Sequence, residues 1–481
     1  MQLVVVTRTA GLLAGIFSLS LLLPLLVGLL YGERHLGNFL LPGALFMVVG
    51  FALWYPWRKL QPRFTRKDGF LIVALFWGLM SLLGAMPLWL GLDINFSSAL
   101  FESASAITTT GATVLTGLDD LPHSILFYRQ LLQWMGGMGL IVLGLAVLPM
   151  LGIGGMQLYR AEAPGPMKEE KLTPRMASTA RALWMIYLGL TAACALAYWL
   201  AGMGPFDAIA HSLSTLSTGG FSTHDASLGH FQSSAVEGVA MFFMLLASIN
   251  FAVHFHVLHH REPLHYLREP EARVFLIFVL VMVVLVGLTL RLEGAYQALG
   301  DSFRDAAFQV VSVVTSTGYG TVDFTQWPDY LPTLLLFISF VGGCGGSTAG
   351  GMKVMRVMLL FKQGMREVRK LIHPNAVLPV KLHGMVIEQR VMNAVWGFFA
   401  AYAAVFVLLM LLMMHTGLDQ VSAFAAVATC INNLGPGLGE VAYNFQSVSD
   451  AGKWISVLAM LMGRLEIFTI LILLSPAFWK D

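Results

Sequence analysis

The stretch DSFRDAAFQVVSVVTSTGYGT (301–321) decides the fold. Helix-compatible residues lead into a polar patch that ends in glycine, and the helical part is far shorter than the roughly 20 residues that cross a bilayer. The same pattern occurs in SSALFESASAITTTGATVLTG (97–117), PFDAIAHSLSTLSTGGFST (205–223) and DQVSAFAAVATCINNLGPGLG (419–439). The key glycines of the four segments are Gly111, Gly219, Gly318 and Gly435, spaced by 108, 99 and 117 residues. This near-constant period indicates a fourfold internal repeat.

The chain around these segments is strongly apolar. Of its 481 residues, 57% are hydrophobic and only 12% are charged, about half of the ~25% charge typical of soluble domains. This composition excludes a soluble enzyme, a nucleic-acid-binding protein and a disordered protein. We predict an all-α membrane protein with ten transmembrane helices, in the stretches 9–32, 36–57, 69–92, 130–159, 182–206, 238–260, 274–290, 330–352, 391–418 and 454–479.

Charge sets the orientation of these helices. With a cytoplasmic N-terminus and alternating spans, 23 of the 29 Lys and Arg residues fall on the inner side, as the positive-inside rule requires. Both termini are then cytoplasmic. Of the 27 Asp and Glu residues, 16 fall outside, and a negative outer surface concentrates cations. The charge pattern therefore favours a cation as the transported substrate.

The repeat predicts a pore. We expect two N-terminal helices in residues 1–68 and four units of span, short helix, glycine turn and span, in residues 69–160, 161–260, 261–385 and 386–481. Non-helical backbone at membrane depth is tolerated only where it is buried in protein or lines an aqueous cavity. Four such turns around one axis could present carbonyl oxygens that replace the hydration shell of a monovalent cation.

Three further stretches accompany the four turns: QWMGGMG (133–139), LPMLGIGGMQLYRAE (148–162) and GGCGGSTAGG (342–351). Together with the turns, they resemble the TrkH family of bacterial potassium-uptake proteins. That family belongs to a superfamily with the Ktr membrane subunits and the HKT transporters. The resemblance implies a protein of the bacterial inner membrane that moves potassium inward, generally as a homodimer with a complete pore in each subunit. It also implies a cytosolic TrkA-like nucleotide-binding regulatory subunit, while this chain itself binds potassium and no nucleotide.

The resemblance also implies the residues of a potassium filter. The fourth turn reads NNLGPG instead of the Thr-Gly form, so we expect only approximate fourfold symmetry. The filter residues carried over are Thr109, Thr110 and Gly111; Ser217, Thr218 and Gly219; Ser316, Thr317 and Gly318; and Asn433, Leu434 and Gly435.

A glycine-rich run, VGGCGGSTAGG (341–351), interrupts the predicted span 330–352. Each glycine costs a helix about 1 kcal/mol, so a continuous helix is not expected there. A phosphate-binding loop is excluded because no Gly-Lys-Ser/Thr follows, whereas close helix packing through small residues remains an alternative. We expect a gating loop below the filter, as the family resemblance implies, formed by Gly345, Gly346, Ser347, Thr348, Ala349 and Gly350.

Arg464 lies within the last predicted span, where a charge is costly and usually faces water or a partner. Glu466 is two residues away and does not share its helix face. We expect Arg464 to project into the pore below the filter, to repel cations and to hold the glycine run closed, and the family has a similar arginine in its last span. A structural ion pair with another helix is the alternative.

Several assignments remain open at this stage. Glu102 and Asp305 lie in the short helices and could add charge to the outer mouth or accept hydrogen bonds from loop amides. His256 and His260 lie one turn apart, either as interfacial histidines or as a metal pair without an evident third ligand. A proton- or sodium-coupled symporter is the main rival function, but such carriers usually need more ionisable groups near the midplane. A membrane enzyme would need a cluster of reactive groups within the spans, which the sequence lacks.

Overall fold

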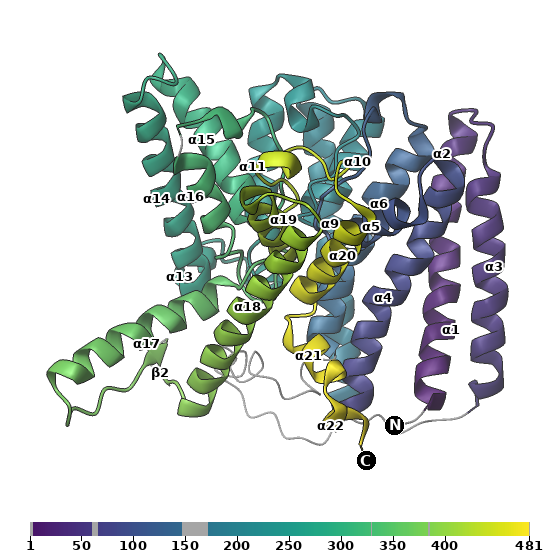
Figure 1. Cartoon of the computed structure of the whole chain (residues 1–481). Coiled ribbons are helices and arrows are strands. Elements are labelled where there is room, and N and C mark those ends of the chain that lie inside the picture. Colours follow the sequence, from purple (N-terminus) through teal and green to yellow (C-terminus); the bar gives the residue numbers. More distant parts are fainter. Residues whose placement is uncertain (1–2, 60–65, 147–171, 329, 383–384, 481) are drawn as a thin grey trace.

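The computed structural model describes residues 3–59, 66–146, 172–328, 330–382 and 385–480, and Figure 1 shows that helices dominate it. The strands β1 (Lys381–Leu382) and β2 (Met385–Val386) form a small antiparallel pair. Five 3-10 helices are η1 Tyr55–Trp57, η2 Leu118–Asp120, η3 Ser227–Phe231, η4 Phe324–Gln326 and η5 Gly439–Val441. The α-helices are α1 Leu3–Ser20, α2 Leu22–Leu30, α3 Gly37–Trp54, α4 Arg66–Gly91, α5 Phe96–Ile107, α6 His123–Ala146, α9 Leu172–Leu200, α10 Pro205–Leu216, α11 Ser234–Ala247, α12 Phe251–His260, α13 His265–Arg268, α14 Pro270–Leu292, α15 Leu299–Val314, α16 Tyr330–Ile338, α17 Val354–Ile372, α18 Gln389–His415, α19 Gln420–Asn432, α20 Asp450–Arg464, α21 Phe468–Leu474 and α22 Pro476–Trp479.

Within the described residues, six helical segments are long and apolar enough to cross a membrane, and two bent helix pairs raise the number to eight. These eight coincide with eight of the ten predicted spans. They are Val4–Leu30, Gly37–Trp57, Lys67–Gly91, Ala180–Leu200, Pro270–Leu292, Gln389–His415, Ser234–Ala247 with Phe251–His260, and Asp450–Arg464 with Phe468–Leu474.

The two other predicted spans have different outcomes. The span 130–159 corresponds to α6, but its second part and the segment LPMLGIGGMQLYRAE (148–162) lie outside the described residues. The span 330–352 is not a continuous helix, because α16 ends at Ile338 and turns follow through the glycine run. This interruption agrees with the expectation drawn from the glycine content.

The bends correct the expectation of a continuous span over 238–260. Helices α11 and α12 meet at 97°, because the three residues between them leave the helical path and Asn250 caps α12 by accepting a hydrogen bond from Ala252 N. Helices α20 and α21 meet at 114°. That second bend lies at Glu466 and Ile467, which both have positive φ.

The short helices α5, α10, α15 and α19 correspond to the four repeated segments. Asn95 and Asp419 begin α5 and α19 by accepting hydrogen bonds from backbone N–H groups of the first turn, and Pro205 begins α10. Such starts are favoured because side-chain oxygens satisfy free N–H groups and proline needs none. The C-terminal turns of all four helices are buried, so these helices end inside the protein.

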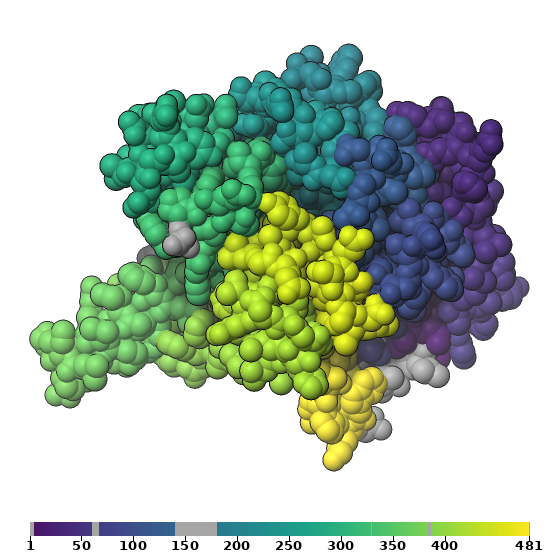
Figure 2. Space-filling model, turned by 45° about the horizontal axis from the view of Figure 1, so that its top comes forward, coloured from purple at the N-terminus to yellow at the C-terminus, as the bar shows by residue number. Residues whose placement is uncertain are grey.

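The chain is arranged around a shared centre. Figure 2 shows the blue, teal, green and yellow segments following one another around it, with the purple N-terminal helices at one edge. Apolar packing joins the segments in pairs: one cluster contains Trp77, Phe101 and Met460, and a second contains Tyr187 and Phe275. In Figure 1, α17 leaves this bundle at the lower left. Its Leu371 side chain is 84% exposed.

Candidate functional site

The four short helices end with the same unusual backbone geometry. After each helix, the N–H of one residue donates to the carbonyl five positions earlier: Thr110 to Ser105 at 2.8 Å, and Gly219 to Ser214, Thr317 to Ser312 and Leu434 to Thr429 at 2.9 Å each. The residue just before each of these donors has a φ between 52° and 55°, and these four residues are Thr109, Thr218, Ser316 and Asn433. A non-glycine residue rarely adopts this left-handed conformation, and such strain clusters at functional sites.

A glycine with positive φ follows in each loop, at Gly111, Gly220, Gly318 and Gly435. The structure therefore corrects the register of the second loop by one residue. The equivalents of Thr109, Thr110 and Gly111 are Thr218, Gly219 and Gly220. The residues expected from the sequence were Ser217, Thr218 and Gly219. The sequence offers two consecutive glycines in this loop, and only the backbone conformation identifies the second as the equivalent one.

These four glycines form a closed ring of contacts between segments about one hundred residues apart in the chain. At each of them, a Cβ atom would collide with the backbone of the next loop, and the fourth loop closes on the first. Only glycine fits at such a close approach. A Cβ added at Gly111 would lie 2.1 Å from the Gly219 carbonyl oxygen, and one at Gly220 would lie 1.9 Å from that of Thr317. A Cβ at Gly318 would lie 2.0 Å from the Leu434 carbonyl oxygen, and one at Gly435 would lie 2.8 Å from that of Thr110.

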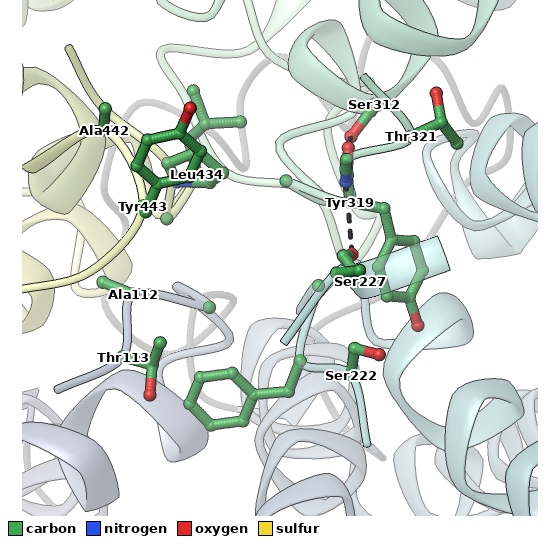
Figure 3. Close-up of a pocket in the computed structure, with 18 of the residues that line it drawn as sticks. Ala112, Thr113, Ser222, Ser227, Ser312, Tyr319, Thr321, Leu434, Ala442 and Tyr443 are labelled. Carbon is green, nitrogen blue, oxygen red and sulfur yellow. Dashed lines mark hydrogen bonds between the residues drawn. The ribbon is translucent and has the colours of Figure 1, made fainter. Parts of the chain in front are cut away.

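A cavity of about 280 Å³ opens above the ring, and all four ring glycines line it. Figure 3 shows its wall built from four chain segments, represented by Thr113, Ser222, Thr321 and Tyr443. Asp225 and Asp323 add carboxylates to the lining. Burial raises the pKa of Asp323, but hydrogen bonds from Thr325 and Tyr443 outweigh this, so its pKa lies below the ordinary value. Asp225 and Asp323 therefore bring negative charge to the cavity wall, while the positive charge of Arg129, which also lines the cavity, is paired with Glu102.

Buried polar residues brace the ring from outside. Gln133 donates to the Gly219 carbonyl at 2.6 Å and accepts from Ser214 at 2.6 Å and from Phe221 N at 3.2 Å. Sequence reasoning missed this role, although Gln133 begins the quoted QWMGGMG run. A polar glutamine within the otherwise apolar stretch 131–142 was the available signal.

Glu102 accepts hydrogen bonds from loop groups and is fully buried. Its carboxylate accepts from Val114 N at 2.9 Å and from the Thr113 hydroxyl, and it forms an ion pair with Arg129 at 2.7 Å. Arg129 also donates to the Ser222 carbonyl at 3.2 Å, which connects the first loop to the second. This settles the open choice for Glu102 in favour of loop organisation.

The sequence also left open the roles of Asp305 and of the histidines around His256. Asp305 is 4% exposed and pairs with Arg304 at 3.2 Å. Around His256 the structure adds what the sequence did not reveal, because Glu262 and His265 each bring a ligand atom close to it, all within 4.8 Å of one another. The ring of His260 lies 4.3 Å from that of His256.

The glycine run lies directly against the ends of the short helices. Gly350 N donates to the Ser316 hydroxyl at 2.5 Å, and Gly351 N donates to the Asn432 carbonyl at 3.1 Å. The Thr348 hydroxyl donates to the Leu216 carbonyl at 3.1 Å. The run thus contacts three of the four loop regions from the side opposite the outer cavity.

Two anchors hold this run in position. Glu271 accepts from Gly345 N at 2.8 Å and from Met355 N at 3.1 Å. The bend between α11 and α12 leaves carbonyls free, and those of Ala247 and Ser248 accept from Thr348 N at 3.3 Å and Cys344 N at 2.9 Å. Gly346 and Ser347 lie between these anchored positions, and the Ser347 hydroxyl donates to the Cys344 carbonyl at 2.7 Å.

Arg464 contacts the run itself. Its Nη1 donates to the Thr348 carbonyl at 2.9 Å, and the residue is 4% exposed. Glu466 pairs instead with Arg356 at 2.5 Å, and no ion pair of Arg464 is found in the part of the chain that the structure describes. Lys353, which sequence reasoning missed, donates from its Nζ to the Ala349 carbonyl. Two cationic side chains therefore bind the carbonyls of the glycine run.

Comparisons of the chain with a family model, with curated relatives and with a solved structure all agree on one family. The family model for TrkH, a cation transport protein, matches residues 35–480. The Trk system potassium uptake protein TrkH of Vibrio parahaemolyticus serotype O3:K6 (strain RIMD 2210633) is 53% identical over 486 residues and 100% of both chains. The protein of that name from Escherichia coli (strain K12) is 49% identical over 478 residues and 99% of both chains. The crystal structure of the potassium transporter TrkH from Vibrio parahaemolyticus matches with a TM-score of 0.92 and 49% identity over 100% of both chains. The chain therefore belongs to the TrkH family of cation transport proteins.

Proposed function

We propose that this protein carries potassium into the bacterial cell through a selective, gated, channel-like pore in the inner membrane. The closed ring of four left-handed turns and glycines is the observation that carries the proposal. Its relatives bear the name of potassium uptake proteins of the Trk system, which supports potassium as the ion. Membership of a transporter family also means that the chain is not an enzyme.

The proposed architecture has ten transmembrane helices, both termini in the cytoplasm, and four pseudosymmetric units around a central pore. The equivalent backbone geometry at the ends of α5, α10, α15 and α19 supports the fourfold relation. The bent pairs α11–α12 and α20–α21 each count as one interrupted span.

Selection would occur where the four loops meet. Backbone oxygens of the ring segments would replace the hydration shell of potassium. These segments are centred on Thr110, Gly219, Thr317 and Leu434 and include their flanking residues. Gly111, Gly220, Gly318 and Gly435 allow the loops to approach closely enough for this. The negative outer cavity would raise the local cation concentration before the ion enters.

Gating would occur on the inner side of the ring. The glycine run 341–351, which contains the expected gating residues 345–350, donates hydrogen bonds to the ends of three short helices. Arg464 donates to the Thr348 carbonyl of this run. We infer that the run obstructs the pore in this position and that the buried positive charge of Arg464 repels cations. Opening would require the run to leave Ser316 and Asn432.

The proposed assembly is a homodimer that binds a cytosolic TrkA-like nucleotide-binding subunit. Helix α17 leaves the bundle and exposes apolar residues such as Phe361 (72%) and Leu371 (84%), which supports a protein contact there. The segment 353–390 carries eight of the Lys and Arg residues, and its basic surface suits a partner on the cytoplasmic side.

The test is ion flux through the purified chain in liposomes. We expect a current that reverses at the potassium equilibrium potential and a much smaller sodium current under the same gradient. Coupled symport predicts a reversal potential that shifts with an imposed proton or sodium gradient. Absence of potassium flux, with and without a cytosolic nucleotide-binding partner, contradicts the proposal.

A further inference from the structure

Three metal-ligating side chains meet at the outer rim of the cavity. Asp119 lies in η2, His224 in the second outer loop and His230 in η3. The Asp119 Oδ1 atom contacts His224 Nδ1 and lies 4.0 Å from His230 Nδ1. The two imidazole rings are stacked, with centroids 3.5 Å apart and planes inclined by 3°. One ligand atom from each residue lies within 4.8 Å of the others, so a single ion could contact all three.

The cluster joins the outer loops of two different repeats. Asp225 N donates to Asp119 Oδ2 at 3.4 Å, and Leu118 N donates to Asp225 Oδ2 at 3.1 Å, so the two loops hold one another in register. His224 also lines the cavity above the ring. The side chains of Asp119 and His230 are 48% and 46% exposed, so an ion can reach them from outside the cell.

The other side of the His224 ring is arranged like the outer shell of a metal site. Its Nε2 atom has no hydrogen-bond partner among the described residues and lies 3.6 Å from Asp207 Oδ1. The same oxygen accepts a hydrogen bond from Thr223 at 2.7 Å, which fixes the carboxylate. A histidine that binds a metal through one nitrogen usually directs its other N–H toward a carboxylate in this way.

We propose that Asp119, His224 and His230 bind a transition-metal dication such as Zn²⁺ or Ni²⁺ from the external side, and that the bound ion blocks potassium entry. Imidazole nitrogens favour these metals, whereas magnesium and calcium prefer sites made of oxygen. Three protein ligands with a fourth position left to water is a common zinc arrangement. The ion would replace the hydrogen bond between Asp119 and His224.

The blocking effect follows from position and charge. A bound dication would stand at the wall of a cavity that otherwise attracts cations, and would repel potassium across a short distance. It would also tie the first outer loop to the second through the metal. The block rests on the proposed function, whereas metal binding rests on the ligand geometry alone.

Binding is tested first, on the purified, metal-free full-length chain. The background substitutions His256→Gln and His265→Gln remove both imidazoles that lie beside Glu262, so that this inner cluster forms no competing three-ligand site. We expect one Zn²⁺ per chain by titration calorimetry, and Co²⁺ should give the visible absorption of a nitrogen-containing site. Losing an outer-shell group alone typically costs 10–100-fold in metal affinity, so His230→Gln should weaken Zn²⁺ binding by at least about tenfold. The exposed outer residue His35 supplies the matched control His35→Gln, which should bind as the background does.

Flux is tested second, with Zn²⁺ added only outside liposomes or cells and each variant normalised to its own metal-free flux. We expect Zn²⁺ to inhibit the background protein and His35→Gln, and to inhibit His230→Gln only at concentrations at least about tenfold higher. Absence of saturable one-to-one binding, or equal binding by His230→Gln, overturns the site. Binding without inhibition overturns the block. A chain that binds Zn²⁺ but shows no potassium flux under any condition contradicts the proposed function instead.

Discussion

Gly318 lies where the third loop meets the fourth, and its backbone has a φ of 83°. A Cβ there would lie 2.0 Å from the Leu434 carbonyl oxygen, which belongs to backbone and cannot rotate away. The left-handed conformation alone costs an L-residue about 1–2 kcal/mol. We therefore expect Gly318→Ala to abolish selective potassium flux, because the two loops must separate to admit the methyl group. Potassium and sodium flux in liposomes measures this.

Gly320 supplies the matched control in the same loop. A Cβ at Gly320 would meet no heavy atom within 4 Å, and its φ is not in the left-handed region. We expect Gly320→Ala to keep the potassium flux and the preference over sodium. If Gly318→Ala, present in the membrane in equal amount, conducted and selected like Gly320→Ala, the ring would not be the selective element.

Glu102 and Arg129 form a buried ion pair that joins two outer loops. Removing one partner of such a pair typically costs about 3–5 kcal/mol, because the other charge stays buried without compensation. We expect Glu102→Gln to lower the thermal unfolding midpoint clearly and to reduce potassium flux, since Arg129 no longer holds both loops. Thermal unfolding in detergent, monitored as the loss of the monodisperse protein peak, measures the stability.

Asp305 is a suitable comparison because it is an acid in another short helix whose partner, Arg304, is 46% exposed. Asp305 itself is buried, but the charge left behind by its loss is that of the exposed Arg304, which would keep Asp301 and Glu237 within 4.0 Å. Interactions of such an exposed charge contribute about 0–1 kcal/mol. Asp305→Asn should therefore cost much less stability than Glu102→Gln. Equal losses would argue against a special role of the buried pair.

At the scale of elements, three interruptions meet below the ring: the bend between α11 and α12, the bend between α20 and α21, and the glycine run. Helix α20 ends at Arg464, whose guanidinium donates to the Thr348 carbonyl of the run. We expect Arg464→Ala to raise potassium flux several-fold, because it removes both a positive charge and a bond that holds the run in place. Flux in liposomes at matched protein density measures the change.

The charge and the hydrogen bond can be separated by Arg464→Lys. A lysine keeps the positive charge but lacks the planar fork of donors, so its flux should lie between those of the original protein and Arg464→Ala. Unchanged or lower flux in well-expressed Arg464→Ala protein would argue against a gating role. Lys353, which donates to Ala349 of the same run, would then be the remaining candidate.

At the scale of the whole molecule, 16 of the 27 acidic residues lie on the side assigned to the outside. A hydrogen bond from His224 lowers the pKa of Asp119, so this outer carboxylate stays ionised when the medium becomes mildly acidic. The electrostatic screening length falls from about 30 Å at 0.01 M salt to about 10 Å at 0.1 M. We expect the potassium concentration for half-maximal uptake to rise with ionic strength, while the maximal rate stays constant.

An impermeant salt tests this, because it screens the surface without competing for transport, and an uncharged osmolyte at equal osmolarity is the control. The effect should persist from pH 7 to pH 5, because the pKa values of Asp119 and Asp323 lie below their ordinary values. Equal half-maximal concentrations in dilute and concentrated impermeant salt would show that the outer charge does not assist uptake.

The amino-acid sequence alone determined the membrane character, most of the spans and the four short helices. Hydrophobic length and an internal period are local properties, so eight of the ten predicted spans coincide with helical segments of the structure. The break after Ile338 was also predictable, because six glycines in VGGCGGSTAGG cannot sustain a helix. The potassium-binding role of the loop residues stays a prediction from the family resemblance.

Only the tertiary structure decided which residues meet. The equivalence of Gly220 with Gly111 depends on a left-handed turn at Thr218, and the bend before Phe251 depends on carbonyls that bind the glycine run. The Glu102–Arg129 pair and the cluster of Asp119 with His224 and His230 also join distant parts of the chain. Such contacts require the closure of long loops in space, and a single sequence carries no local signal for them.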